Sequence, residues 1–79
     1  MADTREVLSK IGNEVKLLRI QSKYSQEKLA ELSDVDRTFI GSIERGEKNL
    51  SICILMQILD VFHVDLLTFI KNAYEHDTK

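Results

Sequence analysis

The sequence contains no proline and no tryptophan, and only three glycines and one cysteine among its 79 residues. Because tight β-turns depend on glycine and proline, their scarcity argues against a fold rich in hairpins. A lone cysteine excludes an intrachain disulfide and a metal site built on several thiolates. We expect Cys53 to be a small buried hydrophobe in a reducing compartment. Glutamate, lysine, leucine and isoleucine are abundant, and their helix propensities predict an all-α fold.

Long hydrophobic runs are also missing. The longest apolar stretch, Ile52 to Met56, is too short to cross a bilayer, and the first six residues carry charges where a signal peptide needs an apolar run. We therefore expect a cytoplasmic protein with no membrane partner. A chain of 79 residues can bury one small core, so we predict a single domain over residues 1–79.

No segment is strongly positive. The formal net charge is −2, and residues 25–50 carry four basic and six acidic side chains, so no part of the chain is a polybasic tail. A nucleic-acid contact would therefore depend on a few individually placed cations and not on a diffuse positive field.

Polar residues divide the chain into five predicted helices, at about 4–22, 26–32, 37–45, 52–62 and 66–74. Apolar residues recur at three- and four-residue spacing in the first helix, with charged residues such as Glu14 on the opposite face. Side chains suited to N-caps precede the other four helices: Ser25, Asp36, Ser51 and Asp65. Gly46 follows the third helix, where a left-handed residue commonly ends a helix.

Two short helices separated by the turn at residues 33–35 have the geometry of a helix-turn-helix, which we place at about residues 26–45. The small side chain of Ala30 allows close helix approach, and Val35 fills the space after the turn. With Ile40 and Ile43 anchored in the core, the exposed face of the third helix is predicted to hold Arg37, Thr38, Gly41, Ser42 and Arg45.

The residues of this segment resemble a known family. The motif Ser25-Gln26-Glu27-x-Leu29-Ala30, followed by Ile40-x-x-Ile43-Glu44-Arg45-Gly46, resembles the phage-repressor and Cro (XRE-like) helix-turn-helix family. The stretches 36–40 and 43–50 are similar to controller proteins of restriction–modification systems. This resemblance implies a five-helix, phage-repressor-like fold, a symmetric dimer and autoregulation through a palindromic double-stranded DNA operator. A phage or chromosomal repressor, or an interaction module such as an antitoxin, stays open as an alternative.

Three side chains at the third helix are predicted to contact bases: Arg37, Thr38 and Ser42. Arginine can donate two hydrogen bonds to O6 and N7 of guanine, and threonine can offer a hydroxyl and a methyl group. The structural alternatives are a solvated Arg37, or one paired with Asp34, and a Thr38 that only adds polarity to the helix start. Gly41 either lets the helix approach DNA closely or packs against another helix.

Further polar residues surround these positions and are predicted to contact phosphates. Gln26 opens the second helix, whose N-terminus favours an anion, and Arg45, Lys48 and Asn49 lie at and beyond the end of the third helix. Arg19 and Glu44 receive a structural role from the resemblance, which implies a partly buried salt bridge between the first and third helices.

The last two helices, at about 52–74, carry more apolar residues than one small core needs. Leu55, Ile58 and Leu59 suffice for the core, and the surplus predicts a twofold dimer interface, unless all of it is core. The predicted interface residues are Ile52, Cys53, Met56, Phe62, Leu67, Phe69 and Ile70.

Nothing in the sequence brings catalytic groups together. His63 and His76 are far apart, and the apolar setting of Cys53 disfavours a thiolate nucleophile. No phosphate-binding glycine loop or metal-ligand spacing is present in the sequence. We therefore expect a non-enzyme with no cofactor and no metal, and its candidate partners are double-stranded DNA, a second copy of the chain and RNA polymerase.

Overall fold

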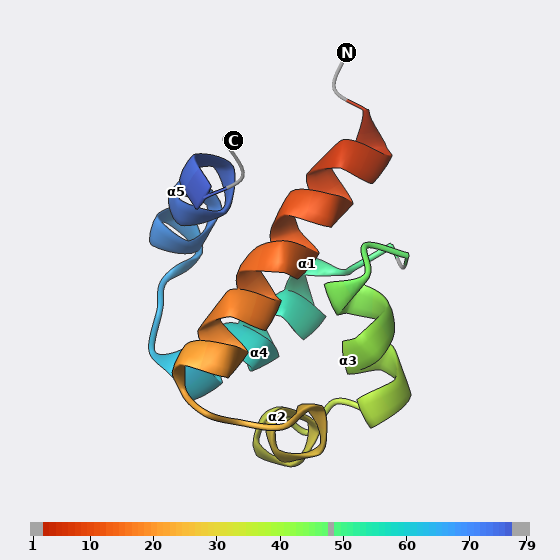
Figure 1. Cartoon of the computed structure of the whole chain (residues 1–79), viewed down its shortest axis with the longest axis vertical. Helices are drawn as coiled ribbons and strands as arrows, with labels where there is room; N and C mark the ends of the chain where they lie inside the picture. Colours follow the sequence, from red (N-terminus) through yellow and green to blue (C-terminus); the bar gives the residue numbers. More distant parts are fainter. Residues whose placement is uncertain (1–2, 48, 77–79) are drawn as a thin grey trace.

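The computed structural model describes residues 3–47 and 49–76, and these form five α-helices without a strand. The helices are α1 (Thr4–Gln21), α2 (Gln26–Ser33), α3 (Arg37–Glu44), α4 (Ile52–Phe62) and α5 (Leu66–His76) (Figure 1). The predicted all-α, five-helix fold is confirmed. Only α5 differs by more than one residue from its predicted end, since it continues two residues beyond Tyr74.

Side-chain caps start the last four helices at the predicted positions. Ser25, Asp36, Ser51 and Asp65 each accept a hydrogen bond, 2.7 to 3.1 Å long, from a backbone amide in the first turn of the helix that follows. These bonds satisfy amides that have no partner inside the helix. At Asp65, hydrogen bonds from the Thr68 side chain and backbone lower the pKa of the carboxyl group.

A left-handed residue lies in each of the four connections between the described helices: Lys23, Asp34, Gly46 and His63. Gly46 has a φ of 72°, as predicted for the residue beyond α3. Asp34 and His63 have φ of 59° and 56° and close α2 and α4 in the same way. Asp34 and His63 are not glycines, so no signal as specific as Gly46 marked these two helix ends in the sequence.

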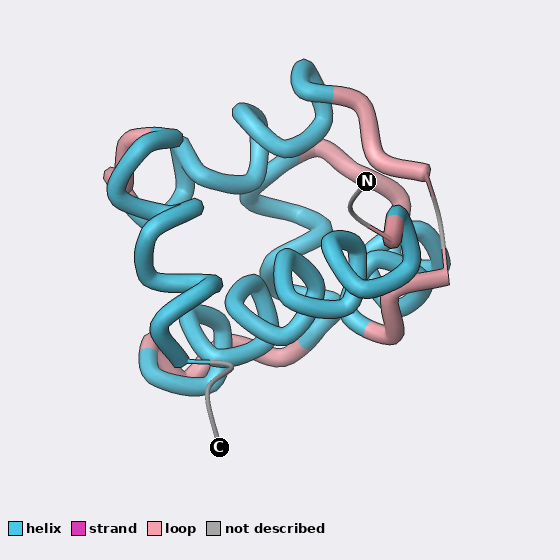
Figure 2. The backbone as a smooth tube through the Cα atoms, turned by 90° about the horizontal axis from the view of Figure 1, so that it is seen from above, coloured by secondary structure: helices cyan, strands magenta, loops and turns pink. Residues whose placement is uncertain are grey.

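The helices enclose one core. α1 packs against α3 and α5, while α2 packs against α3 and α4, so residues far apart in the chain meet around the long first helix (Figure 1). Figure 2 shows the same arrangement from above, with short loops between the helices. The largest fully buried side chains come from all five helices: Val15, Leu29, Ile40, Ile58, Leu59 and Phe69.

Glu14 lies in the interior and not on the solvent-facing side predicted for it. Its residue exposure is 2%, and one carboxylate oxygen lies 2.7 Å from Nδ1 of His76 in the last turn of α5. Because α5 packs against α1, the first helix buries part of two faces instead of one. The charged pattern alone could not reveal this second contact.

Phe69 was predicted at a dimer interface, and this prediction is wrong. The side chain is fully buried in the core of its own chain, whereas Leu67, two residues earlier, is 81% exposed. Two positions along an α-helix differ by about 200° around its axis, so Leu67 and Phe69 cannot face the same surface.

Within the described residues, no single helix is both long and apolar enough to span a membrane. By length and composition alone, α4 and α5 satisfy that criterion together, but they are bent by 88° relative to each other.

Candidate nucleic-acid interface

α2 and α3 form a packed helix pair that presents the N-terminal end of α3. Asp34 turns the chain in the left-handed conformation, and the backbone amide of Val35 then donates to the carbonyl of Ala30 at 3.1 Å. The Val35 side chain is buried behind the turn, where the sequence placed it. Asp36 caps the next helix, so the orientation of α3 is set by its cap and by its buried side.

Arg37 and Thr38 are exposed in the first turn of α3, as predicted. The Arg37 side chain is 57% exposed, and its Nε lies 3.1 Å from Oε2 of Glu27 in α2. Its partner is therefore Glu27 and not Asp34, the partner that the sequence alternative proposed. The sequence offered no signal for this pair because ten positions and a change of helix separate the two residues.

The side chains of Gln26 and Arg45 both lie next to Gly41. A Cβ placed on Gly41 would lie 3.3 Å from Nη1 of Arg45 and 3.7 Å from Oε1 of Gln26. The absence of a side chain at this position lets both polar groups lie close to the helix backbone. Arg45 is also paired through Nε with Glu47 at 3.1 Å, so the chain supplies its own carboxylate to this cation.

Ser42 is buried, with only 6% of its surface exposed, so its predicted place on the exposed face is wrong. Four consecutive residues, Ile40 to Ile43, are buried because α3 packs against both α1 and α2. A pattern that assigns one apolar face to a helix cannot predict the second buried face of a short helix that has neighbours on two sides. We do not include Ser42 among the proposed base contacts.

The loop after α3 contains the remaining predicted phosphate contacts. Asn49 is exposed. Lys48 lies outside the described residues.

Beneath this face, Arg19 and Glu44 join α1 to α3. Nε and Nη2 of Arg19 donate to the two carboxylate oxygens of Glu44 at 2.7 and 3.2 Å, and Nη1 donates to the carbonyl of Tyr24 at 2.8 Å. The Glu44 side chain is almost completely buried. Gln26 donates from Nε2 to the same carboxylate at 3.0 Å, which connects the start of α2 to the ion pair. The sequence did not reveal that Gln26 and Tyr24 belong to this cluster.

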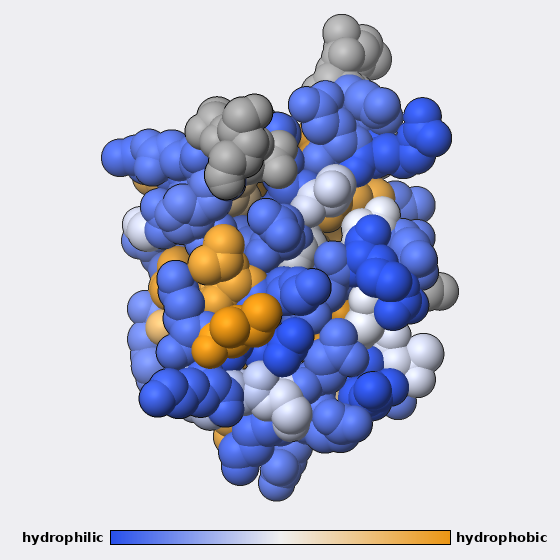
Figure 3. Space-filling view, in the orientation of Figure 1, coloured by the Kyte–Doolittle hydropathy of each residue, from blue (hydrophilic) through white to orange (hydrophobic). Residues whose placement is uncertain are grey.

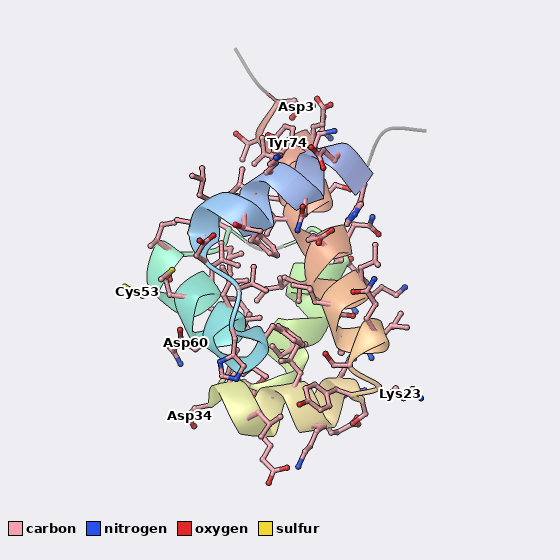
Figure 4. The ribbon with its side chains drawn as sticks, turned by 90° about the vertical axis from the view of Figure 1, so that its left-hand side faces the viewer. Asp3, Lys23, Asp34, Cys53, Asp60 and Tyr74 are labelled. Atoms are coloured by element: carbon pink, nitrogen blue, oxygen red, sulfur yellow. The ribbon has the colours of Figure 1, made fainter. Side chains whose placement is uncertain are left out.

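A second surface, on α4 and α5, is apolar. Ile52, Met56 and Leu67 are large exposed hydrophobic residues, whereas Phe62 and Ile70 are half-buried against the core. Cys53 is exposed at the outer edge of α4, so its predicted burial within its own chain is wrong, whereas its predicted place at a dimer interface stays a prediction (Figure 4). Figure 3 shows apolar side chains gathered over α5 and the C-terminal half of α1. A single chain therefore exposes hydrophobic side chains both on α4 and α5 and at the area shown in Figure 3.

A family model described as helix-turn-helix matches residues 15–69, which include all of α2, α3 and α4. This chain belongs to the helix-turn-helix family. The matched range contains both helices of the predicted motif, α2 and α3, and the helix-turn-helix bounds of about 26–45 stay a prediction.

Within the helix-turn-helix family, the chain is similar to controller proteins of restriction–modification systems. Control protein C.BamHI of Bacillus amyloliquefaciens is 40% identical over 70 residues, which cover 84% of this chain and 86% of that protein. The crystal structure of the restriction–modification controller protein C.Esp1396I is 35% identical, with a TM-score of 0.80 over 87% of this chain and 90% of that one.

The chain is also similar to part of a larger regulator. It is 30% identical over 69 residues to the helix-turn-helix transcriptional regulator RamB of Mycobacterium tuberculosis, and this match covers 87% of the chain but 14% of RamB. The similarity to RamB therefore concerns one small segment of that protein.

Proposed function

We propose that this helix-turn-helix protein is a sequence-specific, double-stranded DNA-binding transcriptional regulator. Within that class it is a restriction–modification controller protein. It binds a palindromic operator as a homodimer and regulates its own gene. The observation that carries the proposal is the exposure of Arg37 and Thr38 at the N-terminal end of α3. That end of a recognition helix enters the major groove and contacts base edges.

The polar groups around this end support the proposal. Gln26 lies in the first turn of α2, where backbone amides favour a phosphate, and its side chain and that of Arg45 both lie next to Gly41. With the exposed Asn49, these residues can contact the DNA backbone and set the register of Arg37 and Thr38.

The solved relatives supply the second line of support. C.Esp1396I has been crystallised as a tetramer in complex with its natural 35 base-pair operator, and also bound to a 25 base-pair operator site. The chain is 35% identical to the protein in both complexes, with TM-scores of 0.80 and 0.78. Operator binding by a multimer is thus the activity most consistent with this sequence and fold.

A symmetric dimer would use the exposed hydrophobic residues of α4 and α5, which include Ile52, Met56 and Leu67. In such a dimer the two α3 helices should lie about 34 Å apart, so that they enter successive major grooves on one side of the DNA. We further propose that the protein acts in the cytoplasm as a non-catalytic single domain, with RNA polymerase as a partner at the promoter.

Selection from a pool of random duplexes tests the proposal and identifies the operator sequence in the same experiment. We expect the purified protein to enrich a short palindrome, and fluorescence anisotropy with that duplex should show affinity that falls steeply with salt, because released counterions contribute to binding. Failure to enrich any sequence, with no salt-dependent binding, would favour the alternative of a protein-interaction module.

A further inference from the structure

Arg19 and Arg37 are each paired with a glutamate, but their guanidinium groups make different contacts. Arg19 donates from both nitrogens of one edge to Glu44 and from its third nitrogen to a carbonyl, and its side chain is only 13% exposed. Arg37 contacts Glu27 through Nε, and more than half of each side chain is exposed. The Arg19 pair is therefore a structural connection, whereas the Arg37 pair leaves hydrogen-bonding capacity unused.

The geometry of the Arg37 pair leaves its terminal amino groups available. Among residues 3–47 and 49–76, only Glu27 is a polar partner of the Arg37 side chain, and the contact is at Nε. The Glu27 carboxylate lies beside the Nε edge of the planar guanidinium as an ion pair, so its charge attracts that edge toward α2 and leaves the Nη1 and Nη2 edge toward solvent. Two N–H groups in one plane are what a bidentate contact with O6 and N7 of guanine requires.

The negative charge of Glu27 also favours a contact of Arg37 with a base over a contact with a phosphate. A phosphate that approached Arg37 would also approach the Glu27 carboxylate, and the two anions would repel each other. Guanine presents neutral acceptors at its major-groove edge, so it does not meet this repulsion to the same extent. Glu27 should therefore weaken the contacts of Arg37 with phosphates more than its contacts with a base.

We propose that Glu27 is the positioning residue for Arg37 and a determinant of DNA specificity. Its charge attracts the Nε edge of the guanidinium, keeps the terminal amino groups available for a guanine and disfavours nonspecific phosphate contacts. This inference rests on the proposed DNA-binding function, and it assigns a role to an acidic residue in a motif whose basic residues contact DNA.

The test compares Glu27→Gln with Glu31→Gln. Both glutamates lie in α2 and are exposed, and both substitutions remove one negative charge, but Glu31 pairs with Lys28 instead of an α3 residue. Anisotropy titrations would measure Kd for the selected duplex and for a scrambled duplex of equal composition. We expect the ratio of the two affinities to fall about two- to fivefold in Glu27→Gln, the size of one exposed ion-pair coupling, and to stay constant in Glu31→Gln.

Repeating Glu27→Gln in an Arg37→Ala background tests whether Glu27 acts through Arg37. We expect Glu27→Gln to leave the ratio unchanged there, because the side chain that it positions is gone. An equal fall in the Arg37→Ala background, an equal fall in Glu31→Gln, or no fall in Glu27→Gln would overturn the inference. A wild-type protein that does not distinguish the two duplexes would instead refute the proposed function.

Discussion

Arg37 and Arg45 lie at opposite ends of α3, and each is more than half exposed and paired with a glutamate of its own chain. These pairs agree with the net charge of −2, since the cations that would bind DNA are already partly neutralised. Exposed ion pairs contribute little to stability. Arg37 and Arg45 would therefore lose little free energy on leaving their glutamates to bind DNA. At this scale, affinity depends on the placement of single side chains.

Arg37→Ala should reduce binding to the selected duplex by about 1–3 kcal/mol and relax discrimination at one guanine, because a bidentate base contact is lost. Competition binding against duplexes substituted at each position measures both effects. Lys28→Ala, which removes another exposed cation from the same helix pair, provides the control. Equal weakening on every duplex would assign Arg37 to the phosphate contacts instead.

Glu44→Ala should lower the free energy of unfolding by about 3 kcal/mol, because Arg19 would remain largely buried without its carboxylate. DNA binding should fall as well, since Gln26 loses the acceptor that holds it at the start of α2. Urea unfolding measures the first effect and anisotropy the second. Glu31→Ala, at an exposed pair, should change stability by at most about 1 kcal/mol. Wild-type stability in Glu44→Ala would show that the buried pair has no structural role.

At the scale of helices, the close approach of α1 and α3 sets the position of α3, the proposed recognition helix. A Cβ on Gly12 would overlap the carbonyl oxygen of Ile43 and would lie 3.0 Å from that of Glu44. No side chain fits at this contact unless one helix moves. The same crossing allows Arg19 to reach Glu44, so the orientation of α3 depends on a glycine that lies outside the helix-turn-helix motif itself.

Gly12→Ala should lower the free energy of unfolding by about 3 kcal/mol, at the upper end of the cost of overpacking, because the obstacle is backbone and not a flexible side chain. Asn13→Ala is the matched control, since this neighbouring residue of α1 is exposed and alanine favours helix. Thermal unfolding compares the two variants. A Gly12→Ala protein within about 1 kcal/mol of wild type would contradict so close a contact.

At the scale of the whole molecule, hydrophobic residues remain exposed on α4 and α5 after the core is complete. Leu55, Ile58 and Leu59 are buried, as predicted, whereas Ile52, Met56 and Leu67 are exposed. A chain of 79 residues buries a small core, so association of two copies would both cover this surface and add stability.

Leu67→Asp should convert the proposed dimer to a monomer, because a carboxylate would have to be buried in an apolar interface. Sedimentation velocity at micromolar concentration measures the change, and circular dichroism should show that the fold is retained. Leu32→Asp places the same charge on an exposed leucine of α2 and should leave the dimer intact. If the Leu67→Asp protein remains dimeric, the interface lies elsewhere.

The sequence determined the elements of this protein because its signals are local. The caps at Ser25, Asp36 and Ser51 and the glycine after α3 act within one helical turn, so they predicted the starts and the end correctly. The predicted helix pair and the exposed Arg37 are likewise present in the structure, because the caps, turn and apolar residues that predicted them lie within the pair itself.

Where a helix has neighbours on two sides, its buried faces follow from the packing of the helices and not from the sequence pattern. Ser42, Glu14 and Phe69 are buried and Cys53 is exposed, in each case contrary to the prediction from the sequence. The packing of the helices also brings Glu27 to Arg37 and Gly12 to the backbone of α3. These contacts join residues on different helices, and their positions follow from how the helices cross, which the local pattern of polar and apolar residues does not specify.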